Sequence, residues 1–316
     1  MPNILITGAA GFVANHLIPL LIPKYEIIGL VLQLPQTKPH PITYLACDIT
    51  ESSTVDQIIS QYKPDFIIHL AAIAQSWKSN ASEIFQTNLI GTLNLYQAIV
   101  NQKSYQPKII YISSSDVYGQ TNNPSHIDET SSLNPTNFYA VSKLSADRLS
   151  YQFAHSQNLN VIMLRPFPHT GPGQNTGFFV PDMASQIAKI EQTHSIDQIS
   201  VGNLTATRDY TDVRDMVQAY HLALTSDLPK GEVYNVSSDR GITIQSMLDL
   251  LVNLSPSALT IHQDPAKLRP VDTPIAIGNS TKFRQATNWQ PTIPISQTLE
   301  DTLNFYRNLQ SSQTIS

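Results

Sequence analysis

The chain has 316 residues and a net charge of -5, and its charged residues make up 14%, against about 25% in an ordinary soluble domain. This composition excludes a coiled coil, a disordered chain and a nucleic-acid binder that depends on a positive surface. Cys47 is the only cysteine, which excludes an intrachain disulfide and a cysteine metal cluster. No signal-peptide pattern opens the chain, and no apolar run is long enough to cross a bilayer. We therefore expect a cytoplasmic protein with no metal, nucleic-acid or membrane partner.

Apolar runs alternate with helix-period segments through the first half of the chain. The runs cover residues 4–7, 25–32, 66–70, 109–113 and 161–165, and the longest helix-period segments cover 81–100 and 136–156. Continuous apolar strands separated by helices predict a parallel sheet that is buried on both faces. We therefore predict an α/β fold with a doubly wound Rossmann sheet.

The pattern changes after Arg165, where a stretch rich in Gly and Pro covers 166–177. A helix is expected over 179–190, and a helix over 213–224 and a strand over 233–236 are expected to return to the sheet. We predict an NAD(P)-binding domain over 1–165, completed by 213–236. A smaller C-terminal α/β substrate-binding domain is predicted from 166–212 and 237–316.

Glycines follow the first apolar run. Gly8 and Gly11 stand between that run and a helix that begins at Phe12 and Val13. Glycine allows a pyrophosphate to approach the backbone, and a helix N-terminus favours its negative charge. Ala14 stands where such loops usually have a third glycine. This position in the chain predicts a dinucleotide site, and the alternative is a plain strand-to-helix turn.

The second apolar run ends without the acidic residue that binds the ribose hydroxyls of NAD, and without an arginine for a 2′-phosphate. The missing acid favours NADP, with NAD as the alternative. Asp48 and Ile49, after the third strand, are placed to bracket the adenine. Asp48 has a second interpretation, as the N-cap of a helix over 52–61, and both roles stay open.

Tyr139 and Lys143 are four residues apart and share one face of a helix. A nearby cation favours phenolate, so we predict that Lys143 and an oxidised nicotinamide ring together lower the pKa of Tyr139. Ser113, Ser114 and Ser115 end the fourth apolar run, at the sheet edge where ligands bind. A lone Tyr–Lys pair at this spacing is also typical of a surface helix. Its combination with the serines and the glycine loop indicates a catalytic site.

At this point the sequence resembles the extended short-chain dehydrogenases/reductases of the NAD-dependent epimerase/dehydratase type, which act on nucleotide sugars. The resemblance covers essentially the whole chain. Besides the glycine loop and the Tyr–Lys helix, it is carried by His69-Leu70-Ala71-Ala72, Asn88 with Gly91-Thr92, the segment from Ser113 to Gly119, Arg165-Pro166-Phe167, the segment from Arg208 to Asp215, and Tyr234-Asn235-Val236.

The resemblance implies roles for individual residues. Ser114 holds the reacting sugar oxygen, Tyr139 is the general acid/base, and Lys143 binds the nicotinamide ribose. The implied cofactor-binding residues are Gly8, Gly11, Phe12, Val13, Asp48, Ile49, Leu70, Ala71, Ala72, Asn88, Tyr139, Lys143, Pro166 and His169. The implied substrate-binding residues include Ser76, Ser114 and Gln174. His69 is interpreted as a structural residue.

The segments Tyr111 to Gln120, Gly171 to Gln174 and Gln263 to Arg269 resemble, within this family, the reductases of GDP-4-dehydro-6-deoxy-D-mannose. The related GDP-mannose dehydratases carry a glutamate where Asp116 stands. The shorter carboxylate reaches less far, and proton transfer requires hydrogen-bond distance, so Asp116 favours reduction of a C4 keto group over dehydration. Its alternative role is to cap a turn. Pro168 stands where the family usually has an asparagine that touches the substrate, and so removes one hydrogen-bond donor.

Arg208 and Arg269 are the candidates for the substrate diphosphate, because planar guanidinium groups match phosphate oxygens. Surface salt bridges are their alternative role. Two other functions stay open: a GDP-mannose 4,6-dehydratase or nucleotide-sugar 4-epimerase with a transiently reduced cofactor, and a non-enzymatic NAD(P)-binding regulator. The resemblance also implies a homodimer built through a four-helix bundle, for which the helices over 81–100 and 136–156 are long enough.

Overall fold

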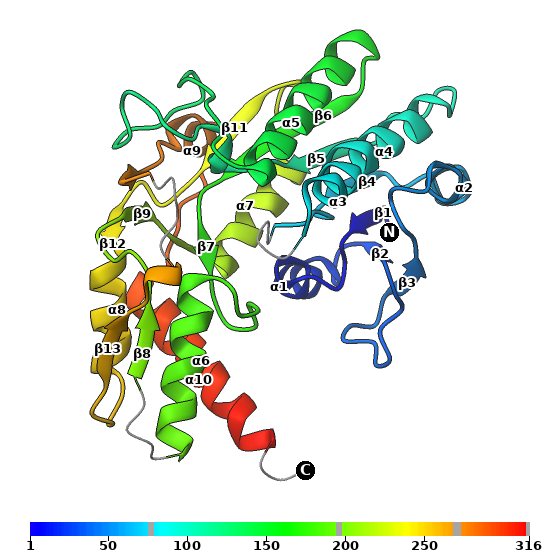
Figure 1. Cartoon of the computed structure of the whole chain (residues 1–316). Coiled ribbons are helices and arrows are strands. Elements are labelled where there is room, and N and C mark those ends of the chain that lie inside the picture. Colours follow the sequence, from blue (N-terminus) through cyan, green and yellow to red (C-terminus); the bar gives the residue numbers. More distant parts are fainter. Residues whose placement is uncertain (75–78, 194–197, 268–272, 314–316) are drawn as a thin grey trace.

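A seven-stranded parallel sheet forms the centre of the computed structural model, which describes residues 1–74, 79–193, 198–267 and 273–313 (Figure 1). The strand order is β11-β6-β5-β4-β1-β2-β3. The strands are β1 Asn3–Thr7, β2 Glu26–Val31, β3 Thr43–Ala46, β4 Phe66–His69, β5 Lys108–Ile112, β6 Asn160–Pro166 and β11 Val233–Val236. Every pair of neighbours is parallel, which confirms the doubly wound α/β fold.

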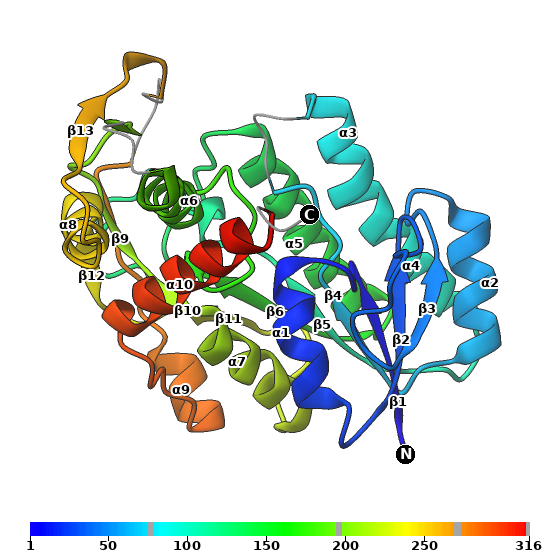
Figure 2. The ribbon, with the colours of Figure 1, turned by 90° about the horizontal axis from the view of Figure 1, so that it is seen from below.

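Helices cover both faces of this sheet (Figure 2). On one face lie α1 Phe12–Leu21 and α7 Val213–Thr225, and on the other lie α2 Ser52–Tyr62, α4 Gly91–Val100 and α5 Phe138–Ser156. Ile4 and Ile6 of β1 pack into the first core and Leu5 packs into the second. Both faces of each strand are therefore apolar, which is why the strands appear in the sequence as continuous runs.

The segment over 81–100 is one long helix in the prediction and three pieces in the structure. They are α3 Ala81–Phe85, the π-helix Gln86–Ile90 and α4. The π-helix carries Asn88, whose side chain is bonded to other segments, and such one-turn bulges are frequent at functional sites. Gly91 follows it because a Cβ there would lie 2.5 Å from the Ile49 side chain.

The order of the strands reverses at β1, which lies between β2 and β4. Ligands bind to such sheets at this reversal, beyond the carboxyl ends of the strands. Thr7 and His69 are the last residues of β1 and β4 and lie side by side in the sheet. The candidate site is therefore expected next to these two residues.

A third core lies outside the sheet and is formed mainly by α6, α8 and α10. The remaining elements are β7 His169–Thr170, α6 Phe179–Thr193, β8 Gln198–Val201, β9 Thr207–Asp209, β10 Thr211–Asp212, β12 Gly241–Thr243, α8 Ile244–Asn253, β13 Thr260–Gln263, β14 Ile275–Ala276, α9 Thr281–Thr287 and α10 Ile295–Gln313, with short 3-10 helices at Ser115–Val117 and Pro265–Lys267. As predicted, α7 and β11 return to the sheet. None of the helices in the described ranges is long and apolar enough to span a membrane.

Candidate functional site

Two glycines shape the turn between β1 and α1. Gly8 has φ +70°, and a Cβ on it would lie 3.0 Å from the backbone of Ala71. Gly11 is the N-cap of α1 and donates its N–H to the carbonyl of Gly8 at 3.0 Å. The helix then begins with Phe12 and Val13. Only glycine fits this close approach at position 8, so the turn offers bare backbone and a helix N-terminus, which together suit a pyrophosphate.

A pocket of about 290 Å³ lies over this turn. It is lined by Gly8, Ala10, Gly11, Val31, Leu32, Gln33, Leu70, Ala71 and Ala72. The pocket thus brings together the predicted glycines and the predicted Leu70–Ala72 segment. Ala10 and the residues that end and follow β2 also line the pocket and were not predicted, although the missing acid after β2 points to that edge.

Ala14 and Asp48 can now be placed. Ala14 is buried in the first core, so its methyl group is accommodated where a glycine is more common. The Asp48 carboxylate accepts from the N–H and the hydroxyl of Thr50, at 2.9 and 2.8 Å. The N-cap of α2 is Glu51, so the N-cap role predicted for Asp48 is wrong. Asp48 instead closes the turn that precedes this helix. Its place beside an adenine stays a prediction.

A buried chain of hydrogen bonds holds the end of β4. Thr7 Oγ1 lies 2.6 Å from His69 Nδ1 and accepts the N–H of Ala71 at 3.0 Å. His69 Nε2 lies 3.0 Å from Thr92 Oγ1, whose own hydrogen goes to the carbonyl of Asn88 at 2.7 Å. Burial lowers the pKa of His69 to about 3, with the charge of Lys143 acting in the same direction. His69 is therefore a neutral structural ring, in line with its interpretation from sequence.

Asn88 holds the segment that follows the pocket lining. Its side-chain oxygen accepts from the N–H of Ile73 at 2.7 Å, and its amide donates to the carbonyl of Ile73 at 3.1 Å and to Ser142 Oγ at 2.9 Å. Ser142 stands directly before Lys143 on α5. Asn88 therefore ties the cofactor side of the pocket to the helix that carries Tyr139 and Lys143.

Ser114, Tyr139 and Lys143 come together at the end of β5. Ser114 lies close enough to Tyr139 to act on the pKa of the phenol, and Ser114 Oγ accepts the N–H of Asp116 at 3.1 Å. The Lys143 ammonium donates to the carbonyl of Ile112, the last residue of β5, and lies 4.6 Å from the centre of the Tyr111 ring. One turn of helix separates the two α5 side chains, so both reach the same strand end.

Burial dominates the electrostatics of this group. Burial raises the pKa of Tyr139, Asp116 raises it further, and the hydrogen bond with Ser114 acts against both. In the protein without cofactor the pKa of Tyr139 is therefore raised, since desolvation of the phenolate dominates. The lowering expected from Lys143 together with an oxidised nicotinamide ring stays a prediction. Burial also lowers the pKa of Lys143 to about 7, against the opposing effect of Asp147.

A buried ion pair lies one helical turn from Lys143. Asp147, one turn further along α5, accepts from Arg165 Nε and Nη2 at 3.0 and 2.9 Å, and both side chains are fully buried. Arg165 also donates to the hydroxyl of Tyr118 at 3.0 Å, which donates to Asn235 at 2.7 Å. Asp147 was not predicted as a site residue, although its spacing of four from Lys143 and eight from Tyr139 places it on the same face of α5.

The predicted residues after β6 approach the glycine loop. The rings of Phe12 and His169 are stacked, with centroids 6.5 Å apart, and Pro166 is buried at the end of β6. Gln174 is buried. Its side-chain Oε1 accepts from the Thr170 hydroxyl at 2.7 Å, and its Nε2 donates to the backbone carbonyl of His169 at 3.4 Å. His169 thus lies beside the glycine loop, Pro166 ends the strand that precedes it, and Gln174 supports the His169 segment.

The predicted diphosphate ligands are described in part. Arg208 is the middle residue of β9 and donates from Nη1 to the carbonyl of Thr207 at 2.9 Å. Arg269 and Ser76 lie outside the described residues. Among the residues that are described, no group of three or more His, Cys, Asp or Glu side chains is placed to hold a metal ion.

Comparison with known proteins agrees with this geometry. A family model described as GDP-mannose 4,6 dehydratase matches residues 5–302. The GDP-6-deoxy-D-mannose reductase of Pseudomonas aeruginosa is 34% identical over 306 residues, which cover 96% of both chains. The GDP-6-deoxy-D-talose 4-dehydrogenase of Aggregatibacter actinomycetemcomitans is 30% identical over 283 residues, which cover 89% of this chain and 90% of the relative.

A solved structure, RMD from Pseudomonas aeruginosa complexed with NADPH, superimposes with a TM-score of 0.85 at 31% identity. It covers 98% of this chain and 100% of the other. The family model spans most of the chain, and the curated relatives match along nearly their whole length. The chain therefore belongs to the GDP-mannose 4,6 dehydratase family, within the extended short-chain dehydrogenases/reductases of the epimerase/dehydratase type.

Proposed function

We propose that the protein reduces the C4 keto group of a GDP-4-dehydro-6-deoxy-hexose, with NADPH as the cofactor and NADH as the alternative. The observation that carries this proposal is that Ser114, Tyr139 and Lys143 converge at the end of β5, next to the glycine-loop pocket. The GDP-sugar oxidoreductases among the relatives support the substrate class.

The residues present fit a dinucleotide. Gly8 leaves room for a pyrophosphate where any side chain would meet Ala71, and the N-terminus of α1 points at the same turn. Leu32 and Gln33 follow β2, at the place where NAD-specific proteins have an acidic residue that binds the ribose hydroxyls. This favours NADPH, the cofactor in the solved structure of RMD. When bound, the reduced nicotinamide supplies the hydride.

The protein's own residues supply the proton and hold the oxygen that receives it. In this proposal Ser114 Oγ donates a hydrogen bond to the C4 carbonyl oxygen, and Tyr139 protonates that oxygen. The raised pKa of Tyr139 keeps the phenol protonated, which is the form that reduction requires. Lys143 anchors α5 to the end of β5, and its ammonium would bind the nicotinamide ribose.

Asp116 favours reduction over dehydration. It lies close enough to Tyr139 to raise the pKa of the phenol, and it stands in the 3-10 helix that Ser114 caps. We infer that its short side chain does not reach the C5 proton of the sugar, for which dehydratases of the family use a glutamate. Arg208 and Arg269 would bind the substrate diphosphate, and Ser76 and Gln174 are further candidates for contact with the substrate. Pro168 has no N–H group that could donate a hydrogen bond to the substrate.

The test is a cofactor assay with purified protein. Addition of the 4-keto GDP-sugar is expected to oxidise NADPH, and the product's configuration at C4, read by NMR, identifies it as GDP-6-deoxymannose or its C4 epimer GDP-6-deoxytalose. Tyr139→Phe is expected to lower turnover by about 10²- to 10⁴-fold. A variant that keeps wild-type turnover would remove Tyr139 from the reaction. Conversion of GDP-mannose into a 4-keto-6-deoxy sugar, without net change in the cofactor, would identify a dehydratase instead.

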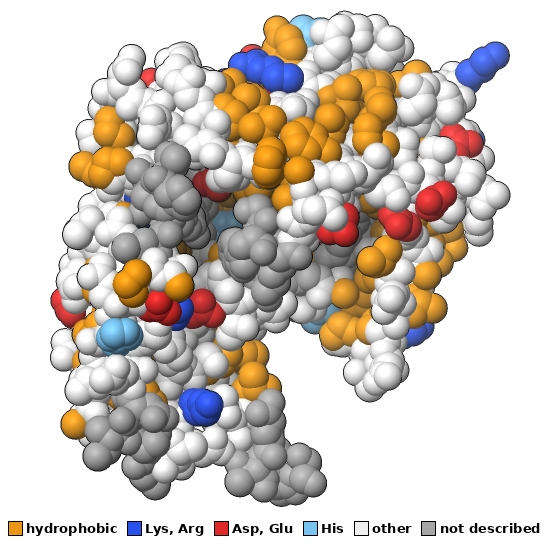
Figure 3. All heavy atoms as spheres, in the orientation of Figure 1, with side chains coloured by type: hydrophobic (Ala, Val, Ile, Leu, Met, Phe, Trp, Pro, Cys, Tyr) orange, Lys and Arg blue, Asp and Glu red, His pale blue; other side chains and the backbone are white. Residues whose placement is uncertain are grey.

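We also propose a homodimer. Hydrophobic side chains gather over α4 and α5 on the face seen in Figure 3. Phe138 is 61% exposed, Val141 on α5 and Leu93 on α4 are partly exposed, and so is Leu89 in the π-helix that precedes α4. Two copies of this face would form a four-helix bundle. Val141→Glu is expected to yield monomers in sedimentation, whereas a monomeric wild type would contradict the dimer.

The domain division is a further part of this proposal. The two cores on either side of the sheet would belong to the cofactor domain, residues 1–165 and 213–236. The separate core of α6, α8 and α10 would belong to the substrate domain, residues 166–212 and 237–316. Limited proteolysis with and without NADPH is the measurement, and protection confined to fragments from the first set is expected.

A further inference from the structure

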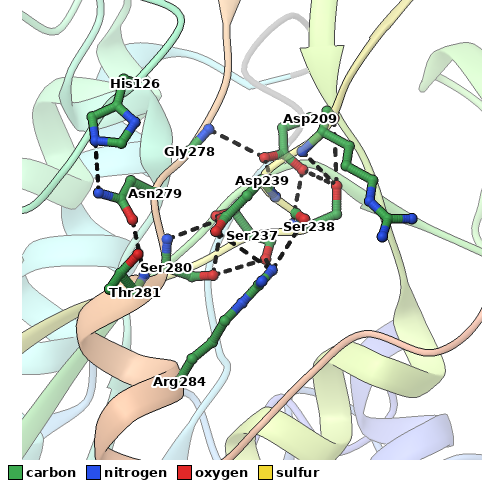
Figure 4. Close-up of polar contacts among 11 residues, drawn as sticks. His126, Asp209, Ser237, Ser238, Asp239, Gly278, Asn279, Ser280, Thr281 and Arg284 are labelled. Atoms are coloured by element: carbon green, nitrogen blue, oxygen red, sulfur yellow. Dashed lines mark hydrogen bonds and ion pairs between the residues drawn. The ribbon is translucent and has the colours of Figure 1, made fainter.

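Asp209, the last residue of β9, is fixed by four hydrogen bonds from two distant segments (Figure 4). Its fully buried carboxylate accepts from the N–H and the hydroxyl of Ser238, at 2.9 and 2.5 Å. It also accepts from the N–H groups of Asp239 and Gly278, at 2.9 and 3.1 Å. With two donors on each oxygen, the carboxylate has one orientation and joins β9 to the loop after β11 and to the segment before α9.

A second carboxylate continues the contact. Asp239 Oδ1 accepts from the hydroxyl of Ser237 at 2.5 Å and from the N–H and hydroxyl of Ser280, both at 2.9 Å. Its Oδ2 lies 3.5 Å from Arg284 Nη2. Asp239 has φ +62°, a conformation that non-glycine residues keep only where the surroundings hold them. We call Asp209, Asp239 and these partners the two-aspartate clamp.

Gly278 leaves no room for a side chain where the segments of the clamp meet. A Cβ on Gly278 would lie 2.4 Å from Ser237 Oγ and 2.8 Å from Phe167 Cε2. Ser237 directly follows β11, the edge strand of the main sheet. The clamp therefore attaches β9 and α9 to the carboxyl end of that sheet, where the candidate site lies.

Arg208 stands next to Asp209 on the same strand. β9 is the middle strand of a small sheet, and Arg208 is paired with Ile242 of β12 on one side and with Ala276 of β14 on the other. Successive side chains of a strand point to opposite faces, so the clamp grips one face while the Arg208 side chain lies on the other. The position of the guanidinium is thus set by a backbone that the clamp immobilises.

We propose that the two-aspartate clamp positions Arg208 for the diphosphate of the sugar nucleotide, so that Asp239 and Asp209 determine affinity for that nucleotide and not for NADPH. The inference rests on the proposed function, in which Arg208 binds this diphosphate. None of the residues that line the glycine-loop pocket belongs to the clamp, which is the reason to expect an effect on one nucleotide only.

The test is a double-mutant cycle in the full-length protein, with GDP and NADPH titrated separately by calorimetry. Arg208→Ala and Asp239→Asn are chosen because Asp239 is partly exposed, whereas a change at fully buried Asp209 would endanger folding. Each single variant is expected to weaken GDP binding about tenfold, the size of one charge-assisted hydrogen bond. The double variant is expected to bind GDP no more weakly than Arg208→Ala alone. Asp249→Asn, on the exposed face of α8, is the matched control.

Three results would overturn the inference: additive losses in the double variant, an equal loss of NADPH affinity in Asp239→Asn, or no loss of GDP affinity in Arg208→Ala. Any of these, in a protein that still reduces the 4-keto sugar, removes the clamp's role and leaves the proposed reduction intact. The third result also removes Arg208 from the diphosphate site. The expected cycle in a protein that reduces no 4-keto GDP-sugar supports the clamp and removes the proposed function.

Discussion

The Thr7 hydroxyl donates its hydrogen to Nδ1 of His69 across 2.6 Å, at the ends of the two strands where the order of the sheet reverses. Thr92 uses its own hydrogen on the carbonyl of Asn88, so it must accept from His69 Nε2. A neutral ring with a hydrogen on Nε2 is the one tautomer that satisfies both contacts. His69 therefore orders the edge of the pocket and takes no part in proton transfer.

The tautomer gives the first prediction. Burial lowers the pKa of His69 to about 3, so the ring stays neutral from about pH 5 to pH 9. Nitrogen NMR of the histidine side chains is expected to show His69 as an Nε2–H ring whose shifts do not change over this range. A ring that titrates near pH 6 would contradict the hydrogen-bond chain.

Removal of the Thr92 hydroxyl gives the second prediction. Thr92→Val keeps the shape of the side chain and leaves the N–H of His69 unpaired in the core, at a cost of about 1–3 kcal/mol in the free energy of unfolding. Urea denaturation measures this loss. Thr54→Val, on α2 and outside the chain of hydrogen bonds, is the control and is expected to change stability by less than about 0.5 kcal/mol.

Gly8 and Gly173 both have positive φ, but only Gly8 has close neighbours. Alanine at the two positions therefore distinguishes the effect of backbone strain from the effect of a steric contact. Gly8→Ala places a Cβ 3.0 Å from the backbone of Ala71, so we expect NADPH binding to be lost. Gly173 has φ +84° and nothing within 4 Å of a Cβ, so Gly173→Ala is expected to cost about 1–2 kcal/mol of stability and to leave NADPH affinity unchanged. Calorimetric titration with NADPH distinguishes the two, and equal affinities would contradict the placement of the pyrophosphate at Gly8.

Asp116 gives a prediction for the pH dependence. Its negative charge raises the pKa of Tyr139, so Asp116→Asn lowers that pKa and the phenol ionises at a lower pH. Because the protonated phenol is the proton donor, kcat/KM for the keto sugar is expected to fall at lower pH in the variant than in the wild type. Asp227→Asn, an exposed residue after α7, is expected to leave the profile in place. An unchanged alkaline limb in Asp116→Asn would show that Tyr139 is not the group that titrates.

The buried ion pair of Asp147 and Arg165 gives the last prediction. Asp147→Asn leaves the Arg165 charge buried without its carboxylate, which costs about 3–5 kcal/mol of stability. It also removes the charge that opposes the low pKa of Lys143, so the lysine loses its proton at lower pH and NADPH affinity is expected to weaken at pH 7. Glu232→Gln breaks the half-exposed pair with Lys282 and is expected to cost at most about 1 kcal/mol. Losses of similar size in the two variants would contradict the burial of the Asp147–Arg165 pair.

The sequence by itself determined the doubly wound sheet and the two motifs of the site. Strands buried on both faces need apolar residues at every position, and a turn against a pyrophosphate needs glycine, so both leave local patterns. The same holds for Tyr139 and Lys143, whose spacing of four places them on one face of a helix whatever surrounds them.

Only the tertiary structure decided how the site is held and charged. His69 meets Thr7 and Thr92, and Asp209 meets Ser238 and Gly278, across separations that no local pattern records. The pKa of Tyr139 in the protein without cofactor is raised because desolvation depends on everything packed around the phenol. Spacing predicts which side chains share a face, whereas burial, which sets the cost of a charge, exists only once the chain has folded.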